Sequence, residues 1–257
     1  MAAGTLPSNT RRTRSIVLFI VGICLFYAGT LAYNLFHISD VFAFGKNTSL
    51  TTQSYKPIAL TFDDGPNGQA TRTIVDILVK EHVPAAFFMV GKNVAADPAT
   101  VQYVANHGFT IGNHTWDHSW QVPTMTHKQV TEELQKTSSA IQETTGTAPV
   151  YMRWPHGMHN ATDDVVATAL QLQPVDWQID PQDYATNNAD LLAERVVSQI
   201  HGGDTILFHD GLQDGQFSQL LQRRQATISA LPIIIAAVRA QGYTFVSIEQ
   251  LAAFHHQ

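Results

Sequence analysis

Apolar runs and helical patterns alternate along the chain from residue 58 onward. The short apolar runs predict seven strands, at 58–62, 85–90, 109–112, 150–153, 175–179, 204–208 and 243–246. Between the strands, apolar residues recur at the spacing of amphipathic helices, at 70–81, 99–107, 126–145, 162–170, 191–200 and 226–240. Such alternation is typical of a parallel sheet with helical crossovers, so the pattern predicts an α/β domain, built as a barrel or as an open doubly wound sheet.

Polar residues stand directly after several of the predicted strands. In both arrangements the functional residues lie at the carboxyl ends of the strands. Here the polar residues follow five different strands and would have to converge on one place. We therefore favour the barrel.

A membrane-targeting segment precedes this domain. Arg11, Arg12 and Arg14 stand before an uncharged apolar run at 16–33. The length of the run fits an uncleaved anchor better than a cleaved signal peptide, which is the alternative. Basic residues on its N-terminal side place that end in the cytoplasm. We expect a cytoplasmic tail at 1–15, a transmembrane signal-anchor at 16–36, a linker at 37–55 and an extracytoplasmic domain at 56–257. The domain would be held at the cell membrane, or secreted if the segment is cleaved.

Composition narrows the range of partners. The 257 residues are 44% hydrophobic and 14% charged, which fits a folded domain with a sizeable core. A formal net charge of −6, without basic clusters beyond the N-terminus, argues against nucleic acid as a partner. Cys24 is the sole cysteine and lies in the apolar run, so the outer domain suits an oxidising compartment without any disulfide.

The first predicted strand ends in two adjacent carboxylates. Asp63 and Asp64 follow its last apolar residue and precede a turn at Gly65-Pro66. Burying two neighbouring carboxylates is costly, because each loses hydration and the two repel each other. Taken alone, the pattern fits a solvated turn equally well, because Asp and Gly are common turn residues.

Two histidines four residues apart follow the third predicted strand. His114 and His118 would share one face if this segment forms a helical turn. With Asp64 they would supply two nitrogens and one oxygen at about 2.0 to 2.2 Å from a zinc ion, and leave a position open for water and substrate. For an isolated pair with this spacing, two surface histidines would be the better interpretation.

Five short motifs, in order, resemble those of the polysaccharide deacetylase family, the metal-dependent carbohydrate esterases with a NodB-homology domain. The motifs are Thr61–Pro66, Asn113–His118, Arg153–Gly157, Asp176–Tyr184 and Ile206–Asp210. The resemblance covers nearly the whole predicted outer domain, and it implies a distorted (β/α) barrel with seven or eight parallel strands. It also implies one divalent metal ion, with Zn²⁺ as the first choice and Co²⁺, Ni²⁺ or Mn²⁺ as alternatives.

The resemblance implies a role for each motif. Asp64, His114 and His118 would be the metal ligands. Asp63 would be the general base, and His209 would be the general acid. Arg153 would hold the base ionised and aimed. A carboxylate beside the acid would raise the pKa of its imidazole and keep it protonated. We assign that carboxylate to Asp180, with Asp183 as the alternative and Asp176 as a structural residue.

Two motif positions depart from the family pattern. His156 stands where the family usually has tyrosine or another aromatic residue, although the use of the backbone N–H at this position survives a change of side chain. Tyr184 replaces a tryptophan and would keep a flat apolar wall. We expect both to contact substrate, together with Ile206 and Leu207, which would line a small pocket for the acetyl methyl group.

These residues predict a membrane-anchored, metal-dependent N-deacetylase. Its substrate would be an envelope polysaccharide that contains N-acetylglucosamine, above all peptidoglycan. An O-acetyl esterase acting on an acetylated glycan or xylan is the alternative with the same chemistry. A glycan-binding module that has lost catalysis would lack a base, a ligand or an acid, and the sequence contains a candidate for each.

Overall fold

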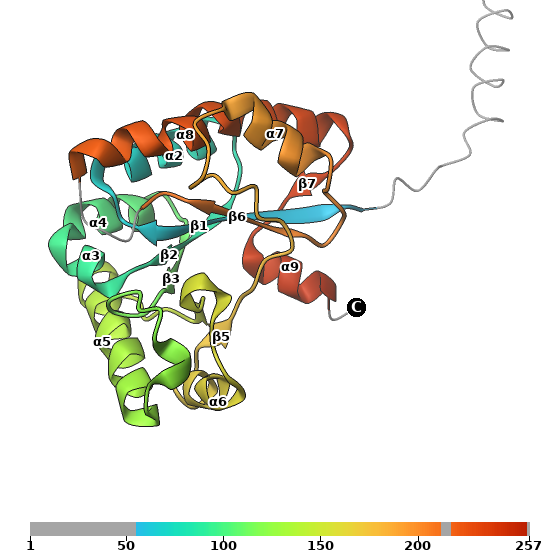
Figure 1. Ribbon diagram of the computed structural model, residues 1–257. Helices are drawn as coiled ribbons and strands as arrows, with labels where there is room; N and C mark the ends of the chain where they lie inside the picture. The colour runs from blue at the N-terminus through green and yellow to red at the C-terminus, as the bar shows by residue number, and fades with distance from the viewer. Residues whose placement is uncertain (1–54, 212–216, 256–257) are drawn as a thin grey trace, which may run out of the picture. The chain divides into compact units, whose positions relative to one another are not determined.

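The structure is a computed structural model that describes residues 55–211 and 217–255 (Figure 1). Its described part forms one unit that begins at Tyr55. The predicted tail and signal-anchor, and all but the last residue of the predicted linker, lie outside the described residues. Among the helices that are described, none combines the length and the apolar character that crossing a bilayer requires. The anchor therefore stays a prediction.

Seven strands form the centre of the unit, and every pair is parallel. They are β1 (Pro57–Gly65), β2 (Ala85–Met89), β3 (Thr110–Asn113), β4 (Tyr151–Met152), β5 (Gln173–Pro174), β6 (Thr205–His209) and β7 (Thr244–Phe245). Their order is β5-β4-β3-β2-β1-β6, and β7 pairs with the first residues of β1. The predicted parallel sheet with helical crossovers is confirmed.

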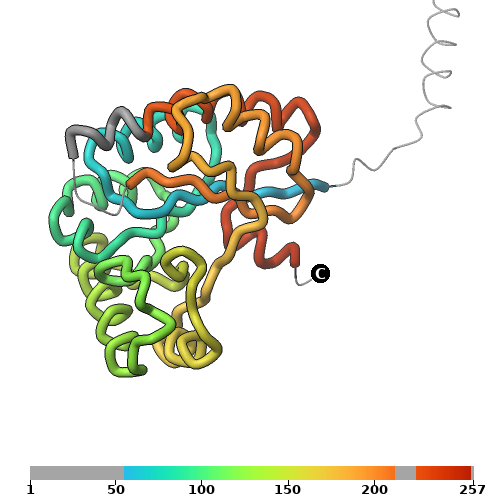
Figure 2. The backbone as a smooth tube through the Cα atoms, viewed as in Figure 1, coloured from blue at the N-terminus to red at the C-terminus, as the bar shows by residue number. Residues whose placement is uncertain are grey.

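The segment that follows β5 connects the two edges of the sheet. After β5 the chain leaves β4 and reaches β6, where Ile179 forms a parallel bridge with Ile206. Figure 2 follows this segment from β5 toward β6. We predicted a strand at 175–179, and this was wrong, because the stretch crosses from one edge of the sheet to the other. The sheet is a curled half-barrel, which is consistent with a distorted (β/α) barrel.

Helices cover the outside of the sheet. They are α2 (Gly68–Lys80), α3 (Gly91–Ala96), α4 (Pro98–Asn106), α5 (His127–Thr145), α6 (Ala161–Ala169), α7 (Ala189–Val197), α8 (Phe217–Ala240) and α9 (Ile248–His255). In Figure 1, α2, α7 and α8 lie together on one side, and α3, α4 and α5 form a second group. The hydrophobic pattern did not predict α3, α9 or the first turns of α8.

Local sequence explains where helix α5 begins and ends. Thr126 caps its N-terminus and forms a reciprocal capping box with Gln129. Gly146 follows its last residue with φ 78°, a left-handed conformation that glycine adopts without steric cost. The long predicted helix at 126–145 is therefore confirmed almost to the residue.

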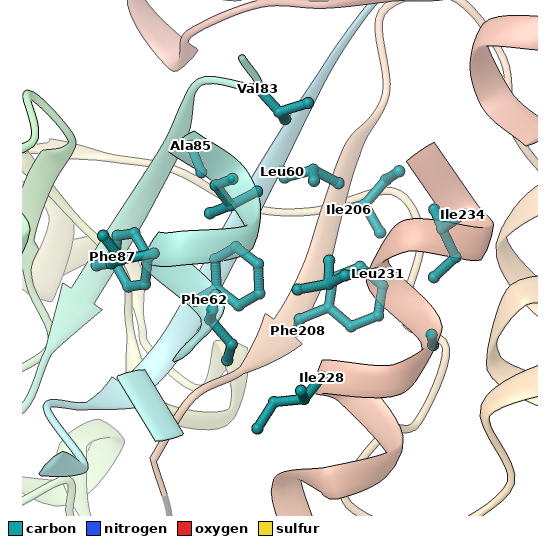
Figure 3. Packing of buried hydrophobic residues seen from close by; sticks show 14 of the residues in the cluster. Leu60, Phe62, Val83, Ala85, Phe87, Ile206, Phe208, Ile228, Leu231 and Ile234 are labelled. Atoms are coloured by element: carbon teal, nitrogen blue, oxygen red, sulfur yellow. The ribbon is translucent and has the colours of Figure 1, made fainter. Parts of the chain in front are cut away.

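The largest part of the core lies between the sheet and the helices that cover one face of it, α2, α4, α7 and α8, and Figure 3 shows part of it. Phe62 of β1 is in register with Phe87 of β2 and with Phe208 of β6. The three rings stack, with centroid distances of 5.1 Å and 5.8 Å from Phe62. Leu231 of α8 belongs to the same buried cluster. This apolar layer fixes the relative position of the three strands.

The alternation of side chains along β1 separates the core from the site. Because successive residues of a strand point to opposite faces, Asp63 faces away from the layer that holds Phe62. On β6, Phe208 belongs to the core and His209 takes the other face. Asp63 and His209 are register partners of β1 and β6, so the packed sheet itself brings these two polar residues side by side.

Candidate metal and catalytic site

Three potential metal ligands meet at the carboxyl end of β1. Asp64, His114 and His118 are buried, and their ligand atoms all lie within 4.8 Å of one another. Asp64 Oδ1 lies 3.1 Å from His118 Nε2 and 3.5 Å from His114 Nε2, and the two imidazole nitrogens are 3.1 Å apart. Three atoms with these separations can all lie at about 2.0 to 2.2 Å from one divalent ion. Asp64 Oδ1 accepts no hydrogen bond from the described residues, which leaves it available to an ion.

The two histidines lie in a loop, and the helical turn under which they would share one face is not formed. Thr115 and His118 have φ 61° and 55°, in the left-handed region that residues other than glycine rarely adopt. Asp64, with φ 72°, shares this uncommon conformation. Such conformations persist only where the surroundings hold them, and they cluster at functional sites. Two left-handed residues, and not a helical face, turn His114 and His118 toward each other.

Side chains from neighbouring elements hold this loop. The amide of Asn113 accepts a hydrogen bond from the Thr115 N–H at 2.9 Å and donates to the Leu134 carbonyl at 2.8 Å. The carboxylate of Glu133 on α5 accepts from the N–H of Trp116 at 2.8 Å. The loop is therefore bonded to α5, which explains how it can keep its strained residues.

Two of the three ligands have pKa shifts that suit metal binding, whereas the third must give up a proton to the ion: burial would lower the pKa of His114, but Asp63 and Asp64 outweigh it and raise this pKa. His114 Nδ1 donates to the Arg153 carbonyl at 2.8 Å, which leaves Nε2 free to bind an ion. Burial, followed by the charge of His114, lowers the pKa of His118 to about 3, so its ring is neutral. Burial alone would raise the pKa of Asp64, but the imidazoles of His114, His118 and His209 outweigh it and hold this pKa well below its usual range.

Arg153 is fully buried and points at Asp63. Its Nη1 donates to Asp63 Oδ1 at 2.8 Å and to the Thr61 hydroxyl at 2.8 Å. Its Nε and Nη2 donate to the carbonyls of Val175 and Asp176, at 2.8 Å and 3.2 Å, on the segment that crosses from β5 to β6. The guanidinium is therefore held from two sides. Its contact with Asp63 is the one that the sequence predicted.

His209 pairs with Asp183, the alternative, so the assignment of its partner to Asp180 is wrong. Asp183 Oδ1 lies 2.7 Å from His209 Nδ1, and Asp183 Oδ2 accepts from the His209 N–H at 3.0 Å. Asp180 instead accepts from the Gln182 N–H at 2.7 Å and from the Tyr184 hydroxyl at 3.1 Å. The cause is a turn at Gln182, with φ 56°, after which Asp183 lies buried in the interior.

The Asp183 carboxylate makes His209 a strong candidate for a general acid. Burial alone would lower the pKa of His209, but the charge and hydrogen bond of Asp183 outweigh it and raise this pKa to about 9. The imidazole is then protonated at neutral pH and can give up a proton.

Two residues of α8 that sequence reasoning did not single out support Asp183. Thr227 donates to Asp183 Oδ2 at 2.7 Å. The buried Arg224 lies 3.3 Å from the same oxygen and donates to the His209 carbonyl at 3.0 Å. Their spacing, Arg-x-x-Thr on one helix face, is visible in the sequence, but nothing there connects it to Asp183. They keep Asp183 ionised by supplying a charge and hydrogen bonds to it.

The four predicted substrate contacts divide into two groups. Tyr184 stands edge-on to His209, with ring centroids 5.4 Å apart, and His156 stands edge-on to His118 at 4.5 Å. Leu207 is buried on the same face of β6 as His209. Ile206 belongs to the core cluster that faces the helices, so its assignment to an acetyl pocket was wrong.

A buried carboxyl group explains the glycine of the first motif. Asp210 follows His209 and accepts a hydrogen bond from the Thr71 hydroxyl. A side chain at Gly65 would collide with the Asp210 carboxyl group, so only glycine fits there. Burial above all raises the pKa of Asp210 to about 7. The Asp-Asp-Gly-Pro turn is therefore packed against the end of β6 and is not solvated.

Taken together, the fold and the site define a class of protein: α/β enzymes with an Asp-His-His group that could hold a metal ion, and a carboxylate and an imidazole placed beside it. A family model described as polysaccharide deacetylase matches residues 51–175. A chitooligosaccharide deacetylase from Bradyrhizobium sp. (strain ANU 289) is 33% identical over 201 residues, which cover 76% of this chain and 90% of that protein. The chain belongs to the polysaccharide deacetylase family.

Two further relatives extend the comparison. The peptidoglycan-N-acetylglucosamine deacetylase PgdA of Listeria monocytogenes (strain 10403S) is 32% identical over 196 residues, or 76% of this chain. Because the match covers 39% of that protein, the chain spans about two fifths of its length. The structure of the peptidoglycan deacetylase PdaC from Bacillus subtilis superposes with a TM-score of 0.68 at 31% identity, covering 80% of this chain and 94% of the other.

Proposed function

We propose that this protein is a metal-dependent hydrolase that removes N-acetyl groups from N-acetylglucosamine units of a cell-envelope polysaccharide, most of all peptidoglycan. The observation that carries the proposal is a complete set of groups in one place. Asp63 and its partner Arg153 lie on one side of the three ligands, and His209 with its partner Asp183 lies beside them on the next strand. Relatives named as deacetylases of peptidoglycan and of chitooligosaccharides support this substrate class.

The chain's own groups divide the proton transfers between them. Arg153 keeps Asp63 ionised and aimed, so that Asp63 can take a proton from the attacking water. The protonated His209 can give a proton to the departing nitrogen, because its pKa lies near 9. A divalent ion bound by Asp64, His114 and His118 would polarise the acetyl carbonyl and acidify a coordinated water. Zinc suits this set of two nitrogens and one oxygen, with cobalt, nickel and manganese as alternatives.

The first prediction tests the activity and its dependence on metal. The purified protein should release acetate from defined chitooligosaccharides or muropeptides, and mass spectrometry should find the matching loss of acetyl groups. A chelator should abolish the reaction, and added zinc should restore it, because Asp64, His114 and His118 offer an open three-ligand site.

The same measurement separates the rival functions. Release from acetylated xylan or another O-acetylated glycan, without release from N-acetylated substrates, would favour the O-acetyl esterase. If the metal-loaded protein released acetate from none of these substrates and still bound the glycans, the inactive glycan-binding module would replace the proposal.

We also propose that residues 16–36 anchor the protein in the cell membrane with the deacetylase domain outside. The basic residues before an uncharged run support this orientation. Protease added to intact cells should degrade the domain from about residue 50 onward and leave the N-terminal tail protected. Recovery of a soluble protein that begins near residue 33 would show a cleaved signal peptide instead.

A further inference from the structure

An exposed tryptophan lies beside the metal ligands. Trp120 follows His118 by two residues, and 61% of its surface is exposed, although tryptophan is usually largely buried. Its ring stacks on His156, with the centroids 3.2 Å apart and the planes 9° from parallel. His156 in turn stands edge-on against His118. Trp120 is therefore linked to a metal ligand through one intervening ring.

A single exposed apolar side chain needs no explanation, but Trp120 differs from that case. The stacking on His156 fixes the orientation of its ring, so little further rotamer freedom is lost when a ligand binds to it. His156 is also the position at which this chain departs from the tyrosine of the family pattern. His156 therefore backs one face of the Trp120 ring, and the exposed part of Trp120 forms a flat aromatic surface beside the site.

A second exposed aromatic lies beside the proposed general acid. Tyr184 is 53% exposed and contacts the proposed general acid His209. One aromatic therefore stands on the side of the metal ligands, and one on the side of the acid. A pyranose ring can present a face of C–H groups, whose partial positive charge suits the negative face of an aromatic ring. Aromatic walls with a few polar groups between them are typical of ligand sites.

We propose that Trp120 and His156 form a platform for the sugar ring next to the N-acetylglucosamine unit that is deacetylated. This inference rests on the proposed function and deepens it. The platform makes the protein bind a glycan of several linked sugars more tightly than a single sugar, because the adjacent sugar adds a stacking contact with Trp120. Trp120 acts as a specificity-determining residue and takes no part in the proton transfers.

The test compares Trp120→Ala with Trp120→Phe in the metal-loaded full chain, and Tyr55→Ala serves as the control. Tyr55 is an exposed aromatic, 56% exposed, next to the start of β1 and at the opposite end of that strand from Asp63. Binding of chitotetraose and of N-acetylglucosamine is measured by calorimetry with each variant in the Asp63→Asn background, so that turnover does not disturb the titration. Acetate release and metal content are measured in parallel.

Trp120→Ala should weaken tetraose binding and raise its KM about tenfold, the effect of one aromatic stacking contact. Binding of the single sugar, kcat and metal content should stay unchanged. Trp120→Phe should restore most of the affinity, and Tyr55→Ala should have no effect. Unequal effects on the two sugars are the readout that a general loss of structure would not give.

Either of two results would overturn the platform: equal weakening for the single sugar and the tetraose, or no weakening for either. Failure of the proposed function gives a different result. A wild-type protein that binds the tetraose without releasing acetate would lack the proposed activity, and the binding comparison would still decide the role of Trp120. A wild-type protein with no affinity for the tetraose would overturn the platform for this class of glycan.

Discussion

Replacing Asp63 with asparagine is expected to leave the metal content unchanged and to lower turnover by about 10²- to 10⁴-fold, the usual contribution of a general base. The asparagine side chain would keep an oxygen for the 2.8 Å hydrogen bond that Arg153 Nη1 donates to Asp63, so the local geometry can survive. An amide cannot take a proton from water. The loss should therefore appear in kcat, with little change in KM.

The neighbouring carboxylate provides the matched control. Asp64→Asn should lower metal content, because Asp64 Oδ1 supplies the oxygen ligand, and excess metal should recover part of the activity. Metal analysis and turnover of both variants decide the division of roles. If Asp63→Asn lost the ion while Asp64→Asn retained it, the two roles would be reversed. Thermal unfolding should be recorded as well, because Arg153 is fully buried and depends on Asp63 for its counter-charge.

The order and type of most elements could be predicted from the sequence, because each apolar run had one plausible structure. The exception is 175–179, where an apolar alternation of Val175, Trp177 and Ile179 resembles a strand. In the structure this segment spans the distance between two sheet edges, with Ile179 pairing at its end. Which edges it connects depends on the curl of the whole sheet, which no local pattern records.

The site was predictable where one spacing determined one contact. The Asp64, His114 and His118 group followed from the motif, although the loop turns by left-handed residues and not by a helix. Ile206 and His209 are an odd number of residues apart on one strand and must point to opposite faces, so the sequence itself places Ile206 away from the site.

The partner of His209 could not be decided from spacing. Asp180 and Asp183 are both near the end of the segment that reaches β6, and the left-handed turn at Gln182 determines which one enters the interior. Arg224 and Thr227 lie on α8, and their contacts with Asp183 arise only when that helix packs on the sheet. The local sequence is therefore enough to identify His209 as the candidate acid, whereas its supporting partners are determined by long-range packing.

Replacing Asp183 with asparagine is expected to move the alkaline limb of the pH–rate profile downward. His209 is competent as an acid below its pKa, which Asp183 raises to about 9, and competence is lost as the pH rises through that value. Without Asp183, the two largest effects that raise this pKa are lost, and burial opposes the charges of Asp64 and Asp63 that remain, so we expect the pKa of His209 to return to about its ordinary value of 6.5. At pH 8 such a group is protonated in about 3% of molecules, so turnover there should fall by about 30-fold.

Asp180→Asn is the matched control for this prediction, because it removes a nearby carboxylate other than Asp183. Asp180 accepts hydrogen bonds from Gln182 and Tyr184, whereas the hydrogen bonds to His209 come from Asp183, so the loss of the Asp180 carboxylate should leave the alkaline limb in place. A divalent ion at the neighbouring ligands disfavours an imidazolium and sets the wild-type limb at or below pH 9, but it acts equally on all the variants. The comparison therefore isolates the carboxylate. If the alkaline limb moved with Asp180→Asn and stayed fixed with Asp183→Asn, Asp180 would be the residue that supports His209. The hydrogen bond between Asp183 and His209 would then not determine the pKa of His209.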